Sequence, residues 1–101
     1  MTTISAFSEA DINTRLTAHP NWTLKDGKLY RRLVFEDFIH AFGFLSQVAI
    51  IAEKMNHHPE WANVYRTVDI YLTTHEVNGV SDRDFALLEK IDKLIGHAGQ
   101  P

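Results

Sequence analysis

An apolar helical pattern over residues 38–56 stops at a histidine pair followed by a proline, His57-His58-Pro59. Proline disfavours the α conformation in the residue before it, so the chain must leave the helix here and continue as extended backbone. The residues from Glu53 to Trp61 therefore gather imidazoles, carboxylates and an indole at a junction between two elements. We expect chemistry at this junction.

Two local signals before the junction predict a helix and then a β-hairpin. Ser8, with Asp11 three residues later, is typical of a capped helix N-terminus. Asp26-Gly27 supplies the positive φ angles of a two-residue hairpin turn, so residues 21–25 and 28–35 should pair as strands. The buried face of this hairpin should carry Trp22, Leu24, Leu29, Leu33 and Phe35.

The longest predicted helix begins after Asp37, its expected N-cap, and runs over Phe38–Asn56. Its apolar residues form two adjacent stripes, one of Phe38, Phe42, Leu45, Ala49 and Ala52 and the other of Phe44, Val48, Ile51 and Met55. One sheet cannot cover both stripes. Either the helix forms an interface with a second subunit, or the terminal helices of the same domain cover the second stripe.

Beyond the proline, residues 64–74 alternate between apolar and polar side chains, which predicts one long strand or two short ones broken near Arg66-Thr67. Asn78-Gly79 indicates a turn. Ser81 is placed to cap a last helix that should end at Gly96.

The order of elements is helix, two strands, helix, two strands, helix. Short hairpin connections favour an antiparallel sheet with the helices packed against one face, which is an α+β fold of α-β-β-α-β-β-α order with four strands. A length of 101 residues fits one domain, spanning 1–101.

Composition limits the function classes. The net charge of -3 and the pI of about 6.0 disfavour direct binding of nucleic acid, whose phosphates need a basic surface. The chain has no cysteine, which excludes disulfides and thiolate chemistry. The N-terminus lacks a signal-peptide pattern and no stretch is expected to approach the length of a membrane span, so we expect a cytoplasmic protein without a membrane partner.

The histidines suit proton transfer, because imidazole titrates near neutral pH. Glu53 lies one helical turn before His57, so the two side chains should share a helix face and hydrogen-bond, while His58 points elsewhere. His75 follows a strand and meets His57 only if that strand runs back beside the helix end. The spacing matches no zinc helix motif, and adjacent histidines rarely bind one tetrahedral ion, so we expect no metal and no cofactor.

These residues also carry a resemblance. The pattern Glu53-x3-His57-His58-Pro59-Glu60-Trp61, followed by Tyr65, His75 and Arg83-Asp84, resembles the signature of the pterin-4a-carbinolamine dehydratases. Ala41-Phe42-Gly43-Phe44-Leu45 is similar to that family as well, and the resemblance extends from about Trp22 onward.

The resemblance implies dehydration of 4a-hydroxytetrahydropterin to quinonoid dihydropterin in the recycling of tetrahydrobiopterin or a related pterin cofactor. It implies His57, His58 and His75 as active-site histidines, with His57 and His75 as the proton-transfer pair and His58 nearer to binding. Expelling the hydroxyl needs a proton, while a nitrogen proton is removed to form the C=N bond. The residues implied to line or brace the pterin pocket are Glu53, Trp61, Arg83 and Asp84.

Alternatives remain for several of these residues. Asp84 is also explained by helix capping alone, and Trp61 and Tyr65 by packing in the core. Animal members of the family also act as dimerisation cofactors of a homeodomain transcription factor, which gives a rival function as an interaction module using the long helix. A homodimer or homotetramer through Phe38–Asn56 is expected. Asn56 departs from the animal members, which carry an acidic residue there.

Overall fold

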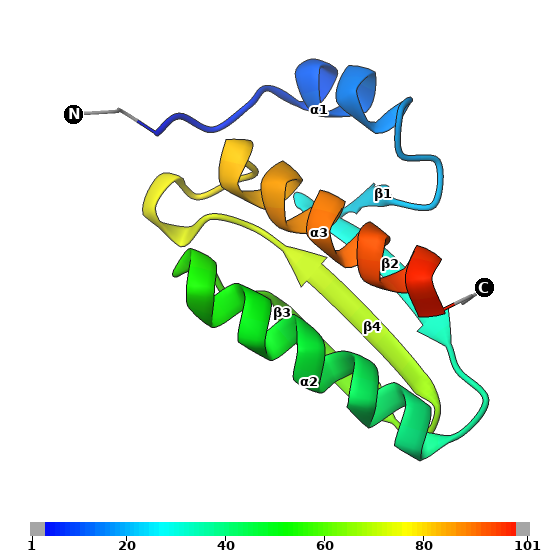
Figure 1. Ribbon diagram of the computed structural model, residues 1–101. Coiled ribbons are helices and arrows are strands. Elements are labelled where there is room, and N and C mark those ends of the chain that lie inside the picture. Colours follow the sequence, from blue (N-terminus) through cyan, green and yellow to red (C-terminus); the bar gives the residue numbers. More distant parts are fainter. Residues whose placement is uncertain (1–3, 99–101) are drawn as a thin grey trace.

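The computed structural model describes residues 4–98, and its elements follow the predicted order. The elements are α1 (Glu9–Leu16), β1 (Thr23–Lys25), β2 (Lys28–Val34), α2 (Phe38–Met55), β3 (Glu60–Val64), β4 (Thr67–Leu72), the short 3-10 helix η1 (His75–Val77) and α3 (Asp82–Ala98). The strands form one antiparallel sheet in the order β1-β2-β4-β3. Helices α2 and α3 lie side by side across one face of it (Figure 1), so the predicted α+β fold is confirmed.

The hairpin and the helix caps form where the sequence predicts them. Asp26 and Gly27 both have positive φ, at 52° and 77°, as the tight turn between β1 and β2 requires. The Ser8 side chain accepts a hydrogen bond from the Asp11 backbone N–H, and Asp37 accepts one from His40 in the same way. Local capping therefore decides where α1 and α2 begin.

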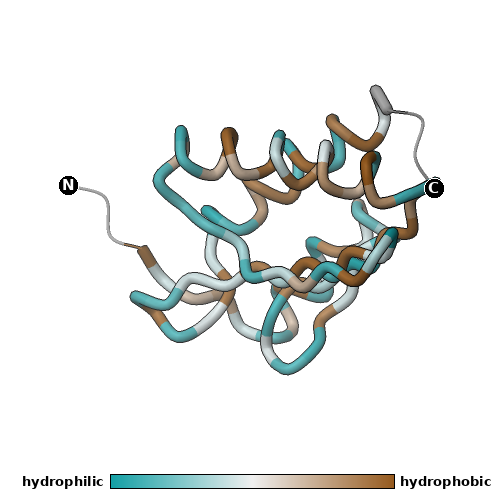
Figure 2. The backbone as a smooth tube through the Cα atoms, turned by 90° about the horizontal axis from the view of Figure 1, so that it is seen from below, coloured by the Kyte–Doolittle hydropathy of each residue, from teal (hydrophilic) through white to brown (hydrophobic). Residues whose placement is uncertain are grey.

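The core lies between the sheet and the helices. Figure 2 shows hydrophobic and hydrophilic residues alternating along the helices and strands, as two-faced elements require. The side chains that are fully buried there include Leu29, Leu33, Val68, Ile70 and Leu72 from the sheet and Val48, Leu87, Leu88 and Ile91 from the helices. Trp22 and Phe35 are buried as predicted, and Leu24 is partly buried against the core.

Helix α2 has one part of its apolar surface covered by the same chain and another part exposed. Ile51 and Met55, on the second stripe, are partly buried against the core on the side that faces α3. Phe38 and Phe42, on the first stripe, remain 47% and 59% exposed. Ile50, outside both stripes, is 67% exposed. The outer surface of α2 is therefore left open.

Two predicted boundaries are wrong. β3 begins at Glu60 rather than at 64, because the extended backbone that Pro59 imposes pairs at once with β4. α3 continues past Gly96 to Ala98, since glycine inside a helix costs only about 1 kcal/mol.

α2 has 18 residues and a mean hydropathy of 1.2, so by length and composition alone it could cross a membrane. Core helices pass the same test, and α2 buries one face on the sheet.

The start of α2 provides a test of local electrostatics. The Asp37 carboxylate lies 2.7 Å from His40 Nδ1, and this hydrogen bond, followed by the charge of Asp37, raises the pKa of His40. The stabilisation is present below the unfolded-state pKa of histidine and is lost as the pH rises through the folded-state pKa. We expect Asp37→Asn, which keeps a capping oxygen, to lower the pKa of His40 toward about 6.5 in an NMR titration.

Glu36→Gln is the matched control, because Glu36 lies 3.6 Å from the same imidazole and is the weakest of the groups that raise its pKa. It should lower the His40 pKa less than Asp37→Asn does. An unchanged pKa in Asp37→Asn would contradict the assignment.

Candidate active site

The end of α2 turns the chain so that His57 points inward. Asn56 adopts the left-handed conformation with φ 54°. The His57 N–H donates to the Ala52 carbonyl at 3.1 Å and the Asn56 N–H to the Glu53 carbonyl at 3.2 Å, which is the Schellman pattern of a helix C-terminus. The His57 side chain is only 9% exposed as a result.

The partner of His57 is the carboxylate of Asp84, at the N-terminus of α3. His57 Nε2 lies 2.6 Å from Asp84 Oδ1, and the Asp84 side chain has no exposed surface. The second oxygen, Oδ2, accepts from the Thr74 hydroxyl at 2.7 Å and from the Ser81 backbone N–H at 2.9 Å. Asp84 therefore caps α3, as its sequence position predicts, and also binds His57, while its place in a pterin pocket stays a prediction.

His58 takes the partner that was predicted for His57. His58 Nε2 lies 2.9 Å from Glu53 Oε1, and both side chains are exposed. The predicted Glu53–His57 hydrogen bond is wrong, because Asn56 ends the helix before His57. His57 is therefore not one helical turn beyond Glu53.

His75 begins η1 and is 77% exposed. Its Nε2 lies 3.3 Å from Glu60 Oε2, while the other oxygen of Glu60 accepts from Lys28 Nζ at 2.6 Å. Arg83 forms a separate ion pair with Glu76 at 3.0 Å. His75 is thus paired with a partly buried carboxylate of β3, and Arg83, in the first turn of α3, with an exposed carboxylate of η1.

Trp61 lies on the other side of the junction, where it is 40% exposed. A hollow of about 340 Å³ between β3 and α2 is lined by Phe38, Phe42, Leu45, Ser46, Ala49, Trp61 and Asn63. Ala49 lines this hollow and Glu53 lies one turn further along the same face of α2. The indole therefore stands beside the α2 face that leads to the Glu53–His58 pair.

One buried network brings distant parts of the sequence together. It runs from His57 through Asp84 to Thr74, and Thr74 directly precedes His75. No hydrogen bond or ion pair joins one imidazole to another within residues 4–98. His57 faces inward while His58 and His75 are exposed, so a hollow shared by all three rings stays a prediction.

Two residues of this region were not predicted from the sequence. Thr74 donates to the buried carboxylate, and Glu60, although part of the signature, was not expected to bind His75. The signal for Thr74 was a hydroxyl residue beside a candidate histidine. Glu60 was missed because the strand was predicted to begin at residue 64, whereas β3 begins at Glu60.

A group of potential metal ligands lies elsewhere. Oxygen and nitrogen atoms of Glu36, Asp37 and His40 fall within 4.8 Å of one another at the start of α2. The Asp37 carboxylate already accepts from the His40 backbone and contacts its ring, so capping explains the group. It includes none of the signature histidines.

Comparison with known proteins agrees with the signature. The profile of the family described as "Pterin 4 alpha carbinolamine dehydratase" matches residues 5–94. A protein of Prochlorococcus marinus (strain MIT 9313), whose name places it among the pterin-4-alpha-carbinolamine dehydratases, is 60% identical over 75 residues, or 74% of this chain and 78% of its own. A similarly named protein of Solibacter usitatus is 51% identical over 87 residues, or 86% and 92% of the two chains.

A solved structure gives the same result for the fold. The crystal structure of a "transcriptional coactivator/pterin dehydratase" from Brucella melitensis is 41% identical, with a TM-score of 0.83. The match covers 88% of this chain and 97% of that one.

The buried carboxylate predicts a large loss of stability on its removal. Asp84→Ala leaves the His57 imidazole, the Thr74 hydroxyl and the Ser81 N–H without their partner, and loss of one partner from such a buried network costs about 3–5 kcal/mol. The free energy of unfolding, measured in urea, should fall by that amount. The control Asp82→Ala removes an exposed acid from the same helix turn and should cost less than about 1 kcal/mol. Equal losses would contradict the role of Asp84.

Proposed function

The chain belongs to the pterin 4 alpha carbinolamine dehydratase family, and on this premise we propose that it removes water from a 4a-hydroxytetrahydropterin to give a quinonoid dihydropterin. The observation that carries the proposal is the short contact between His57 and the buried Asp84 at the end of α2. Pterin recycling for an aromatic hydroxylation is the process such a reaction would serve. The expected cytoplasmic location is part of this proposal.

Asp84 prepares His57 for proton transfer by binding one of its two ring nitrogens, Nε2. An ionised carboxylate only accepts hydrogen bonds, so the proton in the 2.6 Å contact belongs to His57 Nε2. This leaves Nδ1 as the nitrogen that gains or loses a proton during the reaction. Fixing one nitrogen of an imidazole in this way sets the tautomer and the orientation of the other.

The reaction needs two proton movements in opposite directions. One imidazole, as imidazolium, protonates the 4a-hydroxyl group, which leaves as water. A second, neutral imidazole accepts a ring N–H proton as the C=N bond forms. We assign these steps to His57 and His75 and give His58 the binding role, because Glu53 holds its ring on the exposed side of the junction.

The remaining residues are assigned by their exposure. Asp84 is fully buried and therefore braces His57 instead of contacting the substrate. Glu53 and Arg83 are exposed and can bind the polar edge of a pterin. The Trp61 ring offers a flat wall beside the Glu53 face of α2.

We also propose that the chain forms a homodimer or homotetramer through α2. Phe38, Ile39, Phe42 and Ile50 are between 47% and 78% exposed, which is unusual for one helix of a small domain. The same surface supports the rival function, a protein-interaction module, and the Brucella melitensis protein carries both descriptions in its name. The buried Asp84–His57 pair favours the enzyme, because an interaction surface on α2 has no need of it.

The catalytic assignment predicts a large loss of activity in single histidine variants. His57→Ala and His75→Ala should each lower the rate of carbinolamine dehydration by about 10²–10⁴-fold, the usual contribution of a general acid or base. Stopped-flow absorbance with a freshly generated 4a-hydroxytetrahydropterin measures this rate. The control His40→Ala changes an exposed histidine outside the signature and should leave the rate unchanged. Full activity in either His57→Ala or His75→Ala would overturn the assignment.

The open face of α2 predicts the assembly. Phe42→Glu places a charge in the exposed apolar surface and should shift the sedimentation coefficient toward that of a monomer. Ala10→Glu adds the same charge on the exposed side of α1 and should leave the oligomer intact. A monomer at micromolar concentration for the unaltered chain would contradict the proposed oligomer.

A further inference from the structure

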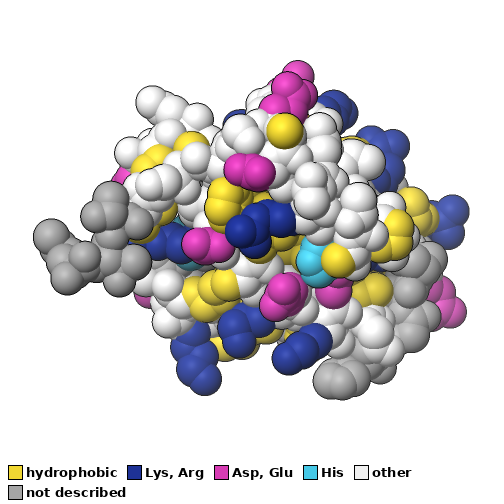
Figure 3. All heavy atoms as spheres, turned by 90° about the horizontal axis from the view of Figure 1, so that it is seen from above, with side chains coloured by type: hydrophobic (Ala, Val, Ile, Leu, Met, Phe, Trp, Pro, Cys, Tyr) yellow, Lys and Arg dark blue, Asp and Glu magenta, His cyan; other side chains and the backbone are white. Residues whose placement is uncertain are grey.

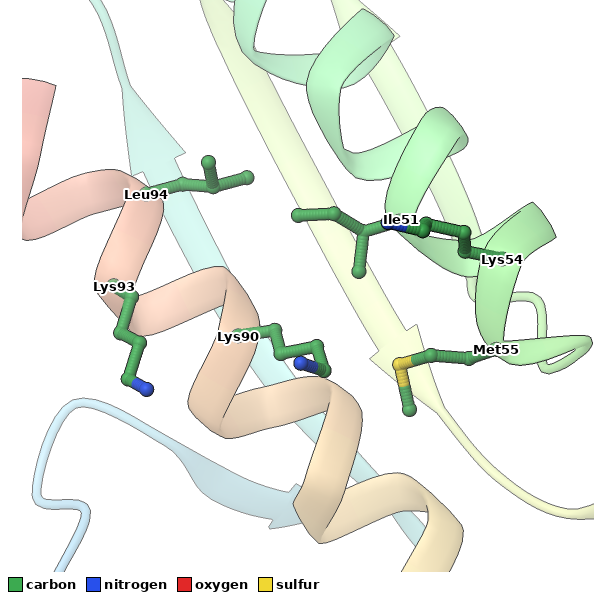
Figure 4. A pocket seen from close by; sticks show the side chains of 6 residues that line it. All are labelled: Ile51, Lys54, Met55, Lys90, Lys93 and Leu94. Carbon is green, nitrogen blue, oxygen red and sulfur yellow. The ribbon is translucent and has the colours of Figure 1, made fainter.

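A hollow between α2 and α3 has no part in the proposed pterin site. Its volume is about 480 Å³, and it is lined by Ile51, Lys54, Met55, Lys90, Lys93 and Leu94. None of the seven residues assigned to the pterin site lines it. Figure 4 shows Ile51 of α2 and Leu94 of α3 pointing toward one another, with the Met55 side chain reaching toward α3.

The floor of this hollow is apolar and continuous with the core. Ile51, Met55 and Leu94 are partly buried and pack against the hydrophobic core. A methionine in such a wall adapts its shape to a ligand, because its side chain is unbranched and polarizable. The volume falls within the range of about 300–1,000 Å³ that is typical of small-molecule sites.

The rim of the hollow carries positive charge that the protein does not balance. Four of the ten basic residues of the chain, Lys28, Arg31, Arg32 and Arg83, form ion pairs. Within the described part of the chain, no carboxylate lies within 4 Å of the ammonium groups of Lys54, Lys90 or Lys93. Near the centre of the face shown in Figure 3, by contrast, basic side chains lie beside acidic ones.

Lys54 comes from α2 and Lys90 and Lys93 come from α3, and all three residues line the same hollow as the apolar floor. Like charges gathered around a low-dielectric surface repel one another and create a local positive potential. The chain as a whole has a net charge of -3, so this potential is a property of the hollow and not of the molecule. A ligand that complements the hollow has an apolar body and an anionic end.

We propose that this hollow binds a small amphipathic carboxylate, with its hydrocarbon body on Ile51, Met55 and Leu94 and its carboxylate among Lys54, Lys90 and Lys93. The binding surface is a hollow between two helices and not a protruding apolar face. It therefore suits a single free molecule better than the surface of a lipid bilayer. A neutral or cationic molecule of the same shape lacks the attraction of the lysines.

The test uses the full chain with isotope-labelled methyl groups and decanoate, below its micelle concentration, as the probe. We expect saturable shifts of the Ile51, Met55 and Leu94 methyl signals with decanoate and none with decyltrimethylammonium. In Lys90→Gln/Lys93→Gln the dissociation constant should rise about tenfold, as the loss of two exposed charge interactions implies. The control Lys25→Gln/Arg66→Gln removes the same charge elsewhere and should leave it unchanged.

Several outcomes overturn the proposal. These are the absence of saturable shifts with decanoate, equal shifts with the cationic analogue, and undiminished binding in the Lys90→Gln/Lys93→Gln variant. Methyl shifts that depend on protein concentration without any decanoate would assign the hollow to a second copy of the chain. Shifts that appear only with anionic lipid vesicles would assign it to a membrane surface.

Discussion

The position of every element near the site depends on the burial of one carboxylate. A buried charge without partners costs several kcal/mol, so Asp84 is stable only if its oxygens are bound. The donors come from three segments of the chain: His57 after α2, Thr74 after β4, and Ser81 before α3. The requirement to satisfy Asp84 therefore fixes the end of α2, the end of β4 and the start of α3 relative to one another.

The same carboxylate explains why two adjacent histidines differ. Asn56 in the left-handed conformation turns the backbone after α2, and the extended residues that follow send successive side chains in opposite directions. His57 therefore turns toward the core and Asp84, while His58 turns outward to Glu53. Asparagine adopts the left-handed region more readily than most residues, so Asn56 has a structural role in ending α2.

Local signals in the sequence predicted the fold well, and contacts between distant residues account for what they missed. The Asp26-Gly27 turn and the capping residues need only their neighbours, so the hairpin and the helix starts were predictable. The buried Arg31 was not, because it shares the inward face of β2 with leucines and is stabilised by Asp92 of α3, far away in sequence. His57 likewise pairs with Asp84, which is distant in sequence, instead of Glu53. The spacing of residues on a helix face no longer applies to His57, because α2 ends before it.

The apolar excess of α2 is divided by its neighbours into surfaces with different chemistry. β3 lies along one side and leaves a hollow of about 340 Å³ that is lined mainly by phenylalanine, tryptophan and small residues. α3 lies along the other side, and three of the six residues that line the hollow of about 480 Å³ there are lysines. The first adjoins the α2 face that carries Glu53, on the side of the proposed pterin site. The second lies on the opposite flank of the helix, where neither proton transfer nor pterin binding accounts for the three unbalanced charges.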